Sequence, residues 1–337
     1  MDGIVGFPLV LVADLPGELS VTFDVTDSLG NPILSNAAGA TLNDTRHMVV
    51  VDADRVMLPG LWRMVARGTR LRVASDIVVG SPTPGALSLW TVVQQVASHY
   101  GEVAEGRIQA VDATGLVLEI PELAYGDGYW VGRHLVIHPE DDLGNGLFSR
   151  RVVEVTGARF TVSDTFPGTP VEGARCAVLP IPAAEILRTL SVSLAEYGKL
   201  GRVPVVVGEQ SPEDGVVRVP YGITHVAEVW LDGARLRDEQ WSLLPGRRLR
   251  VSASGEAVTF KGFMPQYMPA MPTGWLVVEP TTIMAHAGLH IHSARAGGPG
   301  IDVEEHMRRM VLLGQLAEGH LPRLAGRVPH GAREVIP

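Results

Sequence analysis

The chain has 337 residues, of which 46% are hydrophobic and 19% are charged, and its formal net charge is −9. This length suffices for two or three domains. The acidic balance excludes a general nucleic-acid binder, which would carry a basic stripe. Because charged residues usually make up about a quarter of a soluble domain, the low fraction here indicates either surfaces covered by other subunits or a compact, well-buried multidomain monomer.

Cysteine and hydropathy patterns exclude several further classes. Cys176 is the single cysteine, so neither a disulfide within the chain nor a thiolate metal cluster is possible. It lies in an apolar stretch, and we expect an inert, buried thiol. The N-terminus carries Asp2 and no basic residue before its apolar run, which is not typical of a signal peptide. No stretch approaches the ~18 apolar residues of a transmembrane helix.

Residues 1–82 are predicted to form a small β-sandwich. Leu19, Val21, Phe23 and Val25 alternate with polar residues and should share one face of a strand. The strand runs into a turn over 27–32, where glycine permits positive φ and proline ends the ladder. Further strands are expected near 47–51, 61–67 and 71–80.

Residues 83–105 are predicted to be a linking helix. A Pro/Gly-rich linker at 82–85 precedes it. The apolar residues that follow recur at helical spacing and form one stripe: Leu87, Trp90, Val93, Ala97, Tyr100 and Ala104.

Residues 106–180 are predicted to form a small β-barrel or sandwich, because turn signals recur about every ten residues. The expected strands cover 106–112, 115–120, 133–139, 149–155, 159–164 and 174–180.

Residues 181–337 are predicted to be a mixed β/α region. A helix is expected over 182–197, with Gly198 as its C-cap. Strands follow between 203 and 262, and two helices are expected over 275–296 and 302–321. The proline-rich segments 264–273 and 322–337 are expected to be extended arms. The fold class is therefore mainly β with α, in several domains.

Most signatures of catalysis are missing from the sequence. The glycine-rich stretch 297–300 has no following lysine and no preceding strand, so it favours a helix–helix loop over a phosphate site. No nucleophile elbow occurs. The aspartate pairs 52/54 and 141/142 lack further oxygen donors at calcium-loop spacing and favour solvated turns. The six tryptophans are spread over the modules, as core anchors are. We therefore expect no enzymatic activity and no cofactor.

Four histidines are the candidate metal ligands: His286, His290, His292 and His306. A helix would place His286 and His290 on one face, as in many zinc sites. The third ligand would come from His306 or Glu304. Ordinary helix–helix packing is the alternative, and the lack of a glutamate beside the first histidine favours it. The sequence therefore predicts no bound metal, and these four histidines are the weak candidate ligands.

The N-terminal module resembles the Ig-like domain that opens many phage tail and baseplate proteins. The resemblance lies in an alternating strand followed by D-x-x-G-x-P and a later P-G-x-W segment, here Val21–Asp27, Gly30–Pro32 and Pro59–Met64. It covers about 60 residues and implies an Ig-like β-sandwich.

Two further modules resemble virion proteins of tailed phages. The second module is similar to a β domain of neck and tail proteins at 106–108, 129–132, 150–155 and 160–166. The third resembles head–tail connector proteins at 219–223 and 228–233, with two helices after its strands. It departs from them in the inserted segment 264–272 and in the less acidic, less aromatic helices.

The resemblance implies a structural virion protein, assembled in the host cytoplasm as a ring at the neck. Its partners would be copies of itself and portal, neck, tail or capsid proteins, without a membrane. Nucleic acid would at most pass through the lumen of the ring. A tail, baseplate, receptor-binding or glycan-binding module is the alternative, and a metal-dependent hydrolase using the histidines is a further one.

Overall fold

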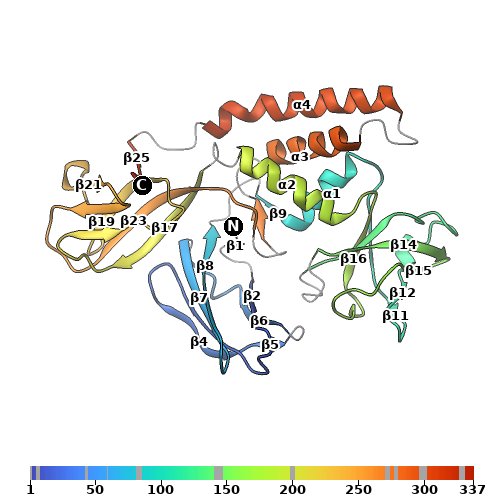
Figure 1. The fold of residues 1–337 in the computed structure, drawn as a ribbon, viewed down its shortest axis with the longest axis horizontal. Helices are drawn as coiled ribbons and strands as arrows, with labels where there is room; N and C mark the ends of the chain where they lie inside the picture. Colours follow the sequence, from blue (N-terminus) through green and yellow to red (C-terminus); the bar gives the residue numbers. More distant parts are fainter. Residues whose placement is uncertain are drawn as a thin grey trace. The chain divides into compact units, whose positions relative to one another are not determined.

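The computed structural model describes residues 2–4, 8–41, 45–58, 60–80, 86–139, 147–197, 202–269, 274–276, 280–295, 302–325 and 331–337. Its fold is mainly β with four α-helices in that part of the chain (Figure 1). The chain divides into two compact units, each assembled from separate segments. Unit 1 comprises Met1–Ala86, Tyr197–Met271 and Pro322–Pro337, and unit 2 comprises Leu87–Glu196 and Pro272–Leu321. The predicted boundaries, by contrast, follow chain order.

Unit 1 begins with a two-sheet β-sandwich. One sheet has the order β1 (Gly3–Ile4), β8 (Arg72–Gly80), β7 (Gly60–Arg67), β3 (Thr22–Thr26) and β4 (Pro32–Ala38). The other has the order β2 (Leu9–Asp14), β6 (Arg46–Val51) and β5 (Ala40–Thr41). The three predicted later strands correspond to β6, β7 and β8, whereas β2 and β4 were not predicted.

Alternation along β3 builds the core of this N-terminal sandwich. Val21, Phe23 and Val25 are buried and pack with Trp62. Leu19, predicted on the same face, is 96% exposed, because it precedes the strand and has no ladder to fix its direction.

The predicted turn over 27–32 is held by Asp27. Its Oδ1 accepts hydrogen bonds from the backbone N–H groups of Leu29 and Asn31, each at 2.9 Å. Gly30 has φ +84°, which only glycine adopts readily. The proline that was expected to end the ladder instead begins β4.

A second β-sandwich follows in unit 1. One sheet has the order β17 (Arg202–Gln210), β23 (Val258–Pro265), β19 (His225–Leu231) and β20 (Ala234–Arg235), and β25 (Arg333–Glu334) also pairs with β19. The other sheet has the order β18 (Val216–Arg218), β22 (Arg248–Val251) and β21 (Trp241–Leu244), with the 3-10 turn η2 (Asp238–Gln240) before β21. These strands coincide with those predicted between 203 and 262.

The C-terminal segment 331–337 is bound to this second sandwich of its own chain. The N–H of Val335 donates to Thr224 O, and those of Gly246 and Arg247 donate to the carbonyls of residues 337 and 336. Arg333 lies over the Trp241 ring, 4.2 Å from its centroid. The predicted arm is therefore extended here, but its hydrogen bonds are within the chain. Its first residues are helical, since α4 (Val303–Ala325) continues into them.

The other predicted arm also packs within unit 1 where it is described. Residues 264–269 continue directly from β23, and Gln266 is 2% exposed. Together with Val78 and Val203 this segment lines a pocket of about 150 Å³.

Glycines permit close backbone approach where the two sandwiches of unit 1 meet. A Cβ on Gly208 in β17 would lie 1.5 Å from the carbonyl oxygen of Ser28. A Cβ on Gly60 would lie 2.6 Å from the oxygen of Val206. Two backbone segments of the chain are therefore in contact at these glycines, where a side chain would not fit.

Unit 2 contains one seven-stranded sheet. Its order is β10 (Ala104–Arg107), β16 (Arg175–Leu179), β13 (His134–Ile137), β14 (Ser149–Thr156), β15 (Arg159–Val162), β12 (Val117–Glu119) and β11 (Ala110–Val111). The 3-10 turn η1 (Pro121–Leu123) follows β12. All six predicted strand regions contain strands, and Trp130 and Cys176 lie in the shared core.

Four helices complete unit 2: α1 (Leu89–Ser98), α2 (Ala183–Tyr197), α3 (Pro280–Arg295) and α4. The two-residue strands β9 (Leu87–Ser88) and β24 (Trp275–Leu276) pair with each other. The linking helix, predicted over 83–105, is shorter at both ends, because Leu87 and Ser88 form β9 and Ala104 pairs with Val178 in the sheet. Likewise, the start of the predicted helix 275–296 is a strand. Ser88 caps α1 by accepting the N–H of Thr91.

No helix in the described part of the chain is both long and apolar enough to cross a membrane. Several predicted features lie outside the described residues: the linker 82–85, the C-cap Gly198, the pair Asp141/Asp142, the loop 297–300 and Pro59.

Candidate functional site

The four candidate histidines separate into two pairs. His286 and His290 on α3 face Glu196 on α2, whereas His292 on α3 contacts His306 on α4. The third donor beside His286 and His290 is thus Glu196, and neither His306 nor Glu304 takes that place. Glu304 instead forms an ion pair with Arg308 at the surface.

Three donor atoms converge between α2 and α3. Glu196 Oε2 lies 3.1 Å from His286 Nε2 and 3.8 Å from His290 Nε2. The ligand atoms of the three side chains all lie within 4.8 Å of one another. His286 is buried, His290 is half-buried and Glu196 is exposed, so the cluster opens to the surface on its carboxylate side.

A fully buried serine orients the His286 ring. Ser193 Oγ lies 2.8 Å from the carbonyl oxygen of Thr189, which can only accept a hydrogen bond. The single hydroxyl hydrogen is therefore donated to that carbonyl. Ser193 Oγ also lies 3.1 Å from His286 Nδ1, so it accepts from Nδ1–H. This fixes the tautomer in which Nε2 carries a lone pair directed at Glu196.

Burial favours the neutral form of His286. Desolvation, together with the neighbouring His290, lowers the pKa of His286 below its ordinary value, while Glu196 acts in the opposite direction. A neutral imidazole is the form that binds metal ions.

An ion pair ties the other ends of the same two helices. Arg295 at the end of α3 donates to both carboxylate oxygens of Glu185 in the first turn of α2, at 2.9 and 2.5 Å. Since Glu196 lies at the opposite end of α2 and faces His286 and His290, which precede Arg295 along α3, the two helices are antiparallel. Arg295 also lies over the Tyr100 ring, 5.5 Å from its centroid.

The second histidine pair is enclosed between aromatic and apolar neighbours. His292 Nδ1 lies 3.1 Å from His306 Nδ1, and the His292 ring stacks on Tyr100 at 4.2 Å between centroids. Desolvation and the adjacent His306 lower the pKa of His292 to about 4. Neither Nε2 atom has a hydrogen-bond partner among the described residues. Within the part of the chain that the structure describes, no third ligand atom joins this pair to form a possible metal site, so the pair is a packing contact.

The other residues considered in the sequence analysis are a cysteine, an aspartate pair and the six tryptophans. Cys176 is fully buried, as predicted, and desolvation raises the pKa of its thiol to about 12. Asp52 and Asp54 are exposed in the turn after β6. Four tryptophans are buried: Trp62, Trp90, Trp130 and Trp241. The other two, Trp230 and Trp275, are partly exposed.

Sequence reasoning missed Thr189, Ser193 and Glu196. Their spacing of four and three residues places them on one face of the predicted helix, and this polar stripe interrupts an otherwise apolar helix face. The sequence alone could therefore have indicated that these three polar residues share one helix face. The sequence pattern could not show that it would meet His286 and His290 about 90 residues later.

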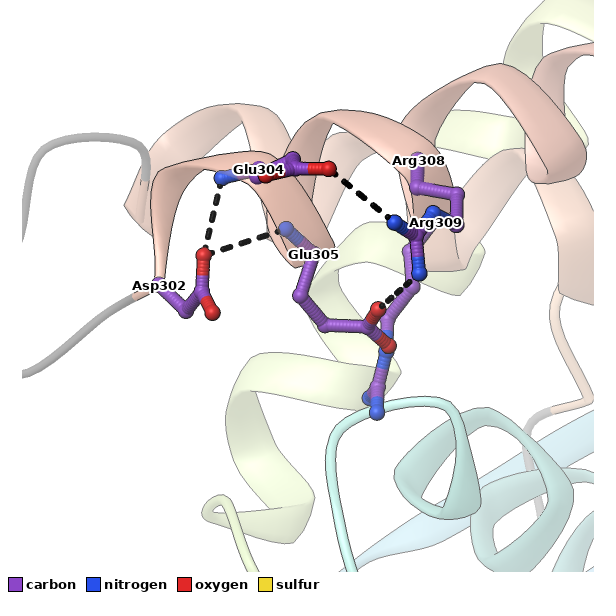
Figure 2. Close-up of polar contacts among 5 residues, drawn as sticks. All are labelled: Asp302, Glu304, Glu305, Arg308 and Arg309. Atoms are coloured by element: carbon purple, nitrogen blue, oxygen red, sulfur yellow. Dashed lines mark hydrogen bonds and ion pairs between the residues drawn. The ribbon is translucent and has the colours of Figure 1, made fainter.

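The outer surface of α4 is a second candidate site. Asp302 caps the helix, since its Oδ1 accepts the N–H groups of Glu304 and Glu305 at 2.9 and 3.2 Å (Figure 2). Figure 2 also shows the ion pairs by which these glutamates bind Arg308 and Arg309, one turn later. Arg309 further donates to the His99 carbonyl at the end of α1.

Apolar side chains lie beside these charges on α4. Val303, Met307 and Val311, four residues apart, are 66%, 55% and 57% exposed. The opposite flank packs Leu313 and Ala317 against α3.

Comparisons with known proteins add little to this description. No protein-family model matches the chain, and no curated protein matches it. A chimeric titin Z1Z2–Z1Z2 tandem aligns with a TM-score of 0.18 and 10% identity over 55% of this chain and 82% of its own.

Two further solved structures align equally loosely. A putative peptidase M23 from Pseudomonas aeruginosa has a TM-score of 0.17 and 14% identity over 53% of this chain and 91% of its own. The titin I-band fragment I67–I69 has a TM-score of 0.17 and 9% identity over 79% and 85%. At such TM-scores, the alignments carry no argument about fold or function.

Proposed function

We propose that the chain is a structural component of a tailed-phage virion, assembling through protein–protein contacts into a ring at the neck as a head–tail connector. Its partners would be copies of itself and portal, neck, tail or capsid proteins. The Ig-like character of the N-terminal sandwich and the resemblance of three successive modules to phage proteins support this proposal. The observation that carries it is the exposed apolar flank of α4.

This apolar flank consists of Val303, Met307 and Val311. Single exposed apolar residues are normal on protein surfaces, but three at a spacing of four form one continuous ridge along a helix. Such a ridge packs into the groove of another helix or sheet. Its exposure in a single chain therefore supports a partner that covers it.

Charges beside the ridge favour a second copy of the same chain as that partner. The whole chain carries a net charge of −9, so two copies repel each other at long range. Around the ridge, however, Glu304 and Glu305 are balanced by Arg308 and Arg309. A second copy supplies both signs at the rim, as the flanking positions of coiled coils do. Rings close when such contacts repeat by rotation.

Mass photometry of the purified full-length chain at micromolar concentration tests the proposal. We expect a stable oligomer, visible as rings in negative stain, that the exposed-site double variant Met307→Glu/Val311→Glu converts to monomer. Leu19→Glu is the matched control, because Leu19 is an isolated exposed leucine in another module, and it should leave the oligomer intact. A clean monomer that also fails to assemble when virion partners are added would refute the proposal.

An exposed aromatic pair favours receptor or glycan binding as a second candidate function. Tyr125 and Tyr129 are 60% and 53% exposed, and their rings stack at 5.8 Å between centroids. Aromatic faces of this kind offer apolar area with a polar tip. A glycan array comparing the native chain with Tyr125→Ala tests it, and silence of the native chain on that array would remove this candidate.

A further inference from the structure

We propose that Glu196, His286 and His290 bind one divalent transition-metal ion, with Zn²⁺ as the preferred species, and that this ion links the C-terminal end of α2 to the middle of α3. The inference is independent of the proposed assembly role. It rests on the convergence of three possible ligand atoms within unit 2.

The first step is the arrangement of acceptors around Glu196. With Nδ1–H donated to Ser193, the Nε2 atom of neutral His286 presents a lone pair to Glu196 Oε2 at 3.1 Å. A carboxylate oxygen is also an acceptor. Two acceptors at this distance repel each other unless a cation lies between them.

The second step distinguishes a proton from a metal ion. A second proton on His286 would satisfy that ring and Glu196. It would leave the Nε2 atom of His290, which is buried and has no hydrogen-bond partner among the described residues. A metal ion satisfies all three donors at once, because His290 Nε2 lies 3.8 Å from the same carboxylate oxygen.

The third step is the fit to coordination geometry. Zn–N and Zn–O distances of about 2.0–2.2 Å place tetrahedral ligand atoms roughly 3.4 Å apart. The two measured distances of 3.1 and 3.8 Å bracket that value. Two imidazoles and a carboxylate leave one position for water, and the exposed side of Glu196 provides solvent access.

The outer contacts are also those of a metal site. Ligating histidines usually donate their second ring N–H to an oxygen that fixes the ring. Ser193 does this for His286, and its own hydroxyl is in turn anchored on Thr189 O. Ser193 is fully buried, so this relay is built into the packing between α2 and α3.

Zinc titration of the untagged, chelator-treated full-length chain, in competition with a chromophoric chelator, tests the site. We expect one equivalent of Zn²⁺ to bind with a Kd of about 1 μM or tighter. Glu196→Gln, an exposed-site change that preserves shape, should weaken binding more than about 100-fold, and Ser193→Ala about tenfold. Co²⁺ should bind in the same place and give the absorption of a four-coordinate ion.

Two variants on the same helix are matched controls. Ser191→Ala removes an exposed hydroxyl that also bonds a carbonyl four residues back, and Glu185→Gln removes the carboxylate at the other end of α2. Both should bind Zn²⁺ as the native chain does. Absence of stoichiometric zinc binding, or binding that Glu196→Gln and His290→Ala leave unchanged, would overturn the proposal. In that case His286 and Glu196 would form a proton-mediated pair.

Discussion

The N-terminal sandwich and the layer formed by α2, α3 and α4 bury different chemistry. The sandwich core is made of aliphatic and aromatic side chains around Phe23 and Trp62. The helical layer also buries apolar side chains, among them Ile186, Leu190 and Ile291, and together with them it buries His286, His292 and Ser193. Apolar burial is non-directional, whereas buried polar groups require specific partners. Buried carboxylates of the sandwich, such as those of Glu18 and Asp27, accept backbone N–H groups from its own turns, whereas the buried histidines of the helical layer meet side chains of a neighbouring helix.

Deleting an aromatic side chain from the sandwich should have the largest effect. Phe23→Ala removes a ring that is fully buried, and we expect the free energy of unfolding to fall by about 3–5 kcal/mol. Leu313→Ala in the helical layer should cost less, about 2–3 kcal/mol, because its neighbours there are small. Chemical denaturation measures both. Leu19→Ala, at an exposed site, is the control and should change the free energy of unfolding by less than about 0.5 kcal/mol. An equal loss in all three variants would contradict the expected difference between the sandwich core and the helical layer.

Removing residues 331–337 tests whether the second sandwich depends on the chain end. The pairing of β25 with β19, three further backbone hydrogen bonds and the bonds from Arg333 to the carbonyls of Trp241 and Asp238 are lost, so we expect the free energy of unfolding to fall by at least about 3 kcal/mol. Hydrogen exchange should rise along β19, whose edge is exposed by the deletion. Unchanged protection there would show that the segment adds no stability.

A glycine-to-alanine substitution should lower the free energy of unfolding in β17, where the two sandwiches of unit 1 meet, and raise it in α4. Gly208→Ala places a methyl group against the Ser28 carbonyl, and we expect a loss of about 1–3 kcal/mol. Gly314→Ala in α4 meets no atom within 4 Å, and we expect a gain of about 0.5–1 kcal/mol from helix propensity. Thermal unfolding of the two variants measures both changes in stability. Destabilisation by both substitutions would show that α4 does not tolerate a side chain at Gly314.

Acid should weaken the sandwich through Glu18. Its carboxylate accepts the Thr69 hydroxyl and the N–H groups of Thr69, Arg70 and Leu71. These bonds, the Thr69 hydroxyl first, lower the pKa of Glu18 from 4.5 to about 2. Because the folded pKa lies below the unfolded one, this stabilisation is complete above pH 4.5 and is lost as the pH falls toward 2.

The variant Glu18→Gln isolates this contribution. It should lower the Tm at neutral pH and flatten the loss of Tm between pH 4.5 and 2, as measured by differential scanning calorimetry. Glu102→Gln, a change in the helix-bearing unit, should leave the slope unchanged. Identical pH profiles for Glu18→Gln and the native chain would mean that Glu18 has the same pKa in both states.

Prediction from sequence succeeded where structure follows from neighbouring residues. The strands within 106–180 and 203–262, the buried Trp130 and the buried Cys176 all follow from alternation and local hydropathy. It failed at Leu19 and at the end of the linking helix. At the end of that helix, apolar residues recur at helical spacing as far as Ala104, but the pairing of Ala104 with Val178 makes this residue part of a strand.

By itself, the sequence determined the mainly β fold class and placed His286 and His290 on one helical face, since both depend on spacing within a single element. Tertiary structure alone decided that Glu196 completes this pair, that His292 turns toward His306, and that residues 331–337 pair with β19. Each of these contacts joins residues that are distant in the chain or lie on different elements. Their formation depends on which surfaces pack together, and periodicity along one segment carries no information about that.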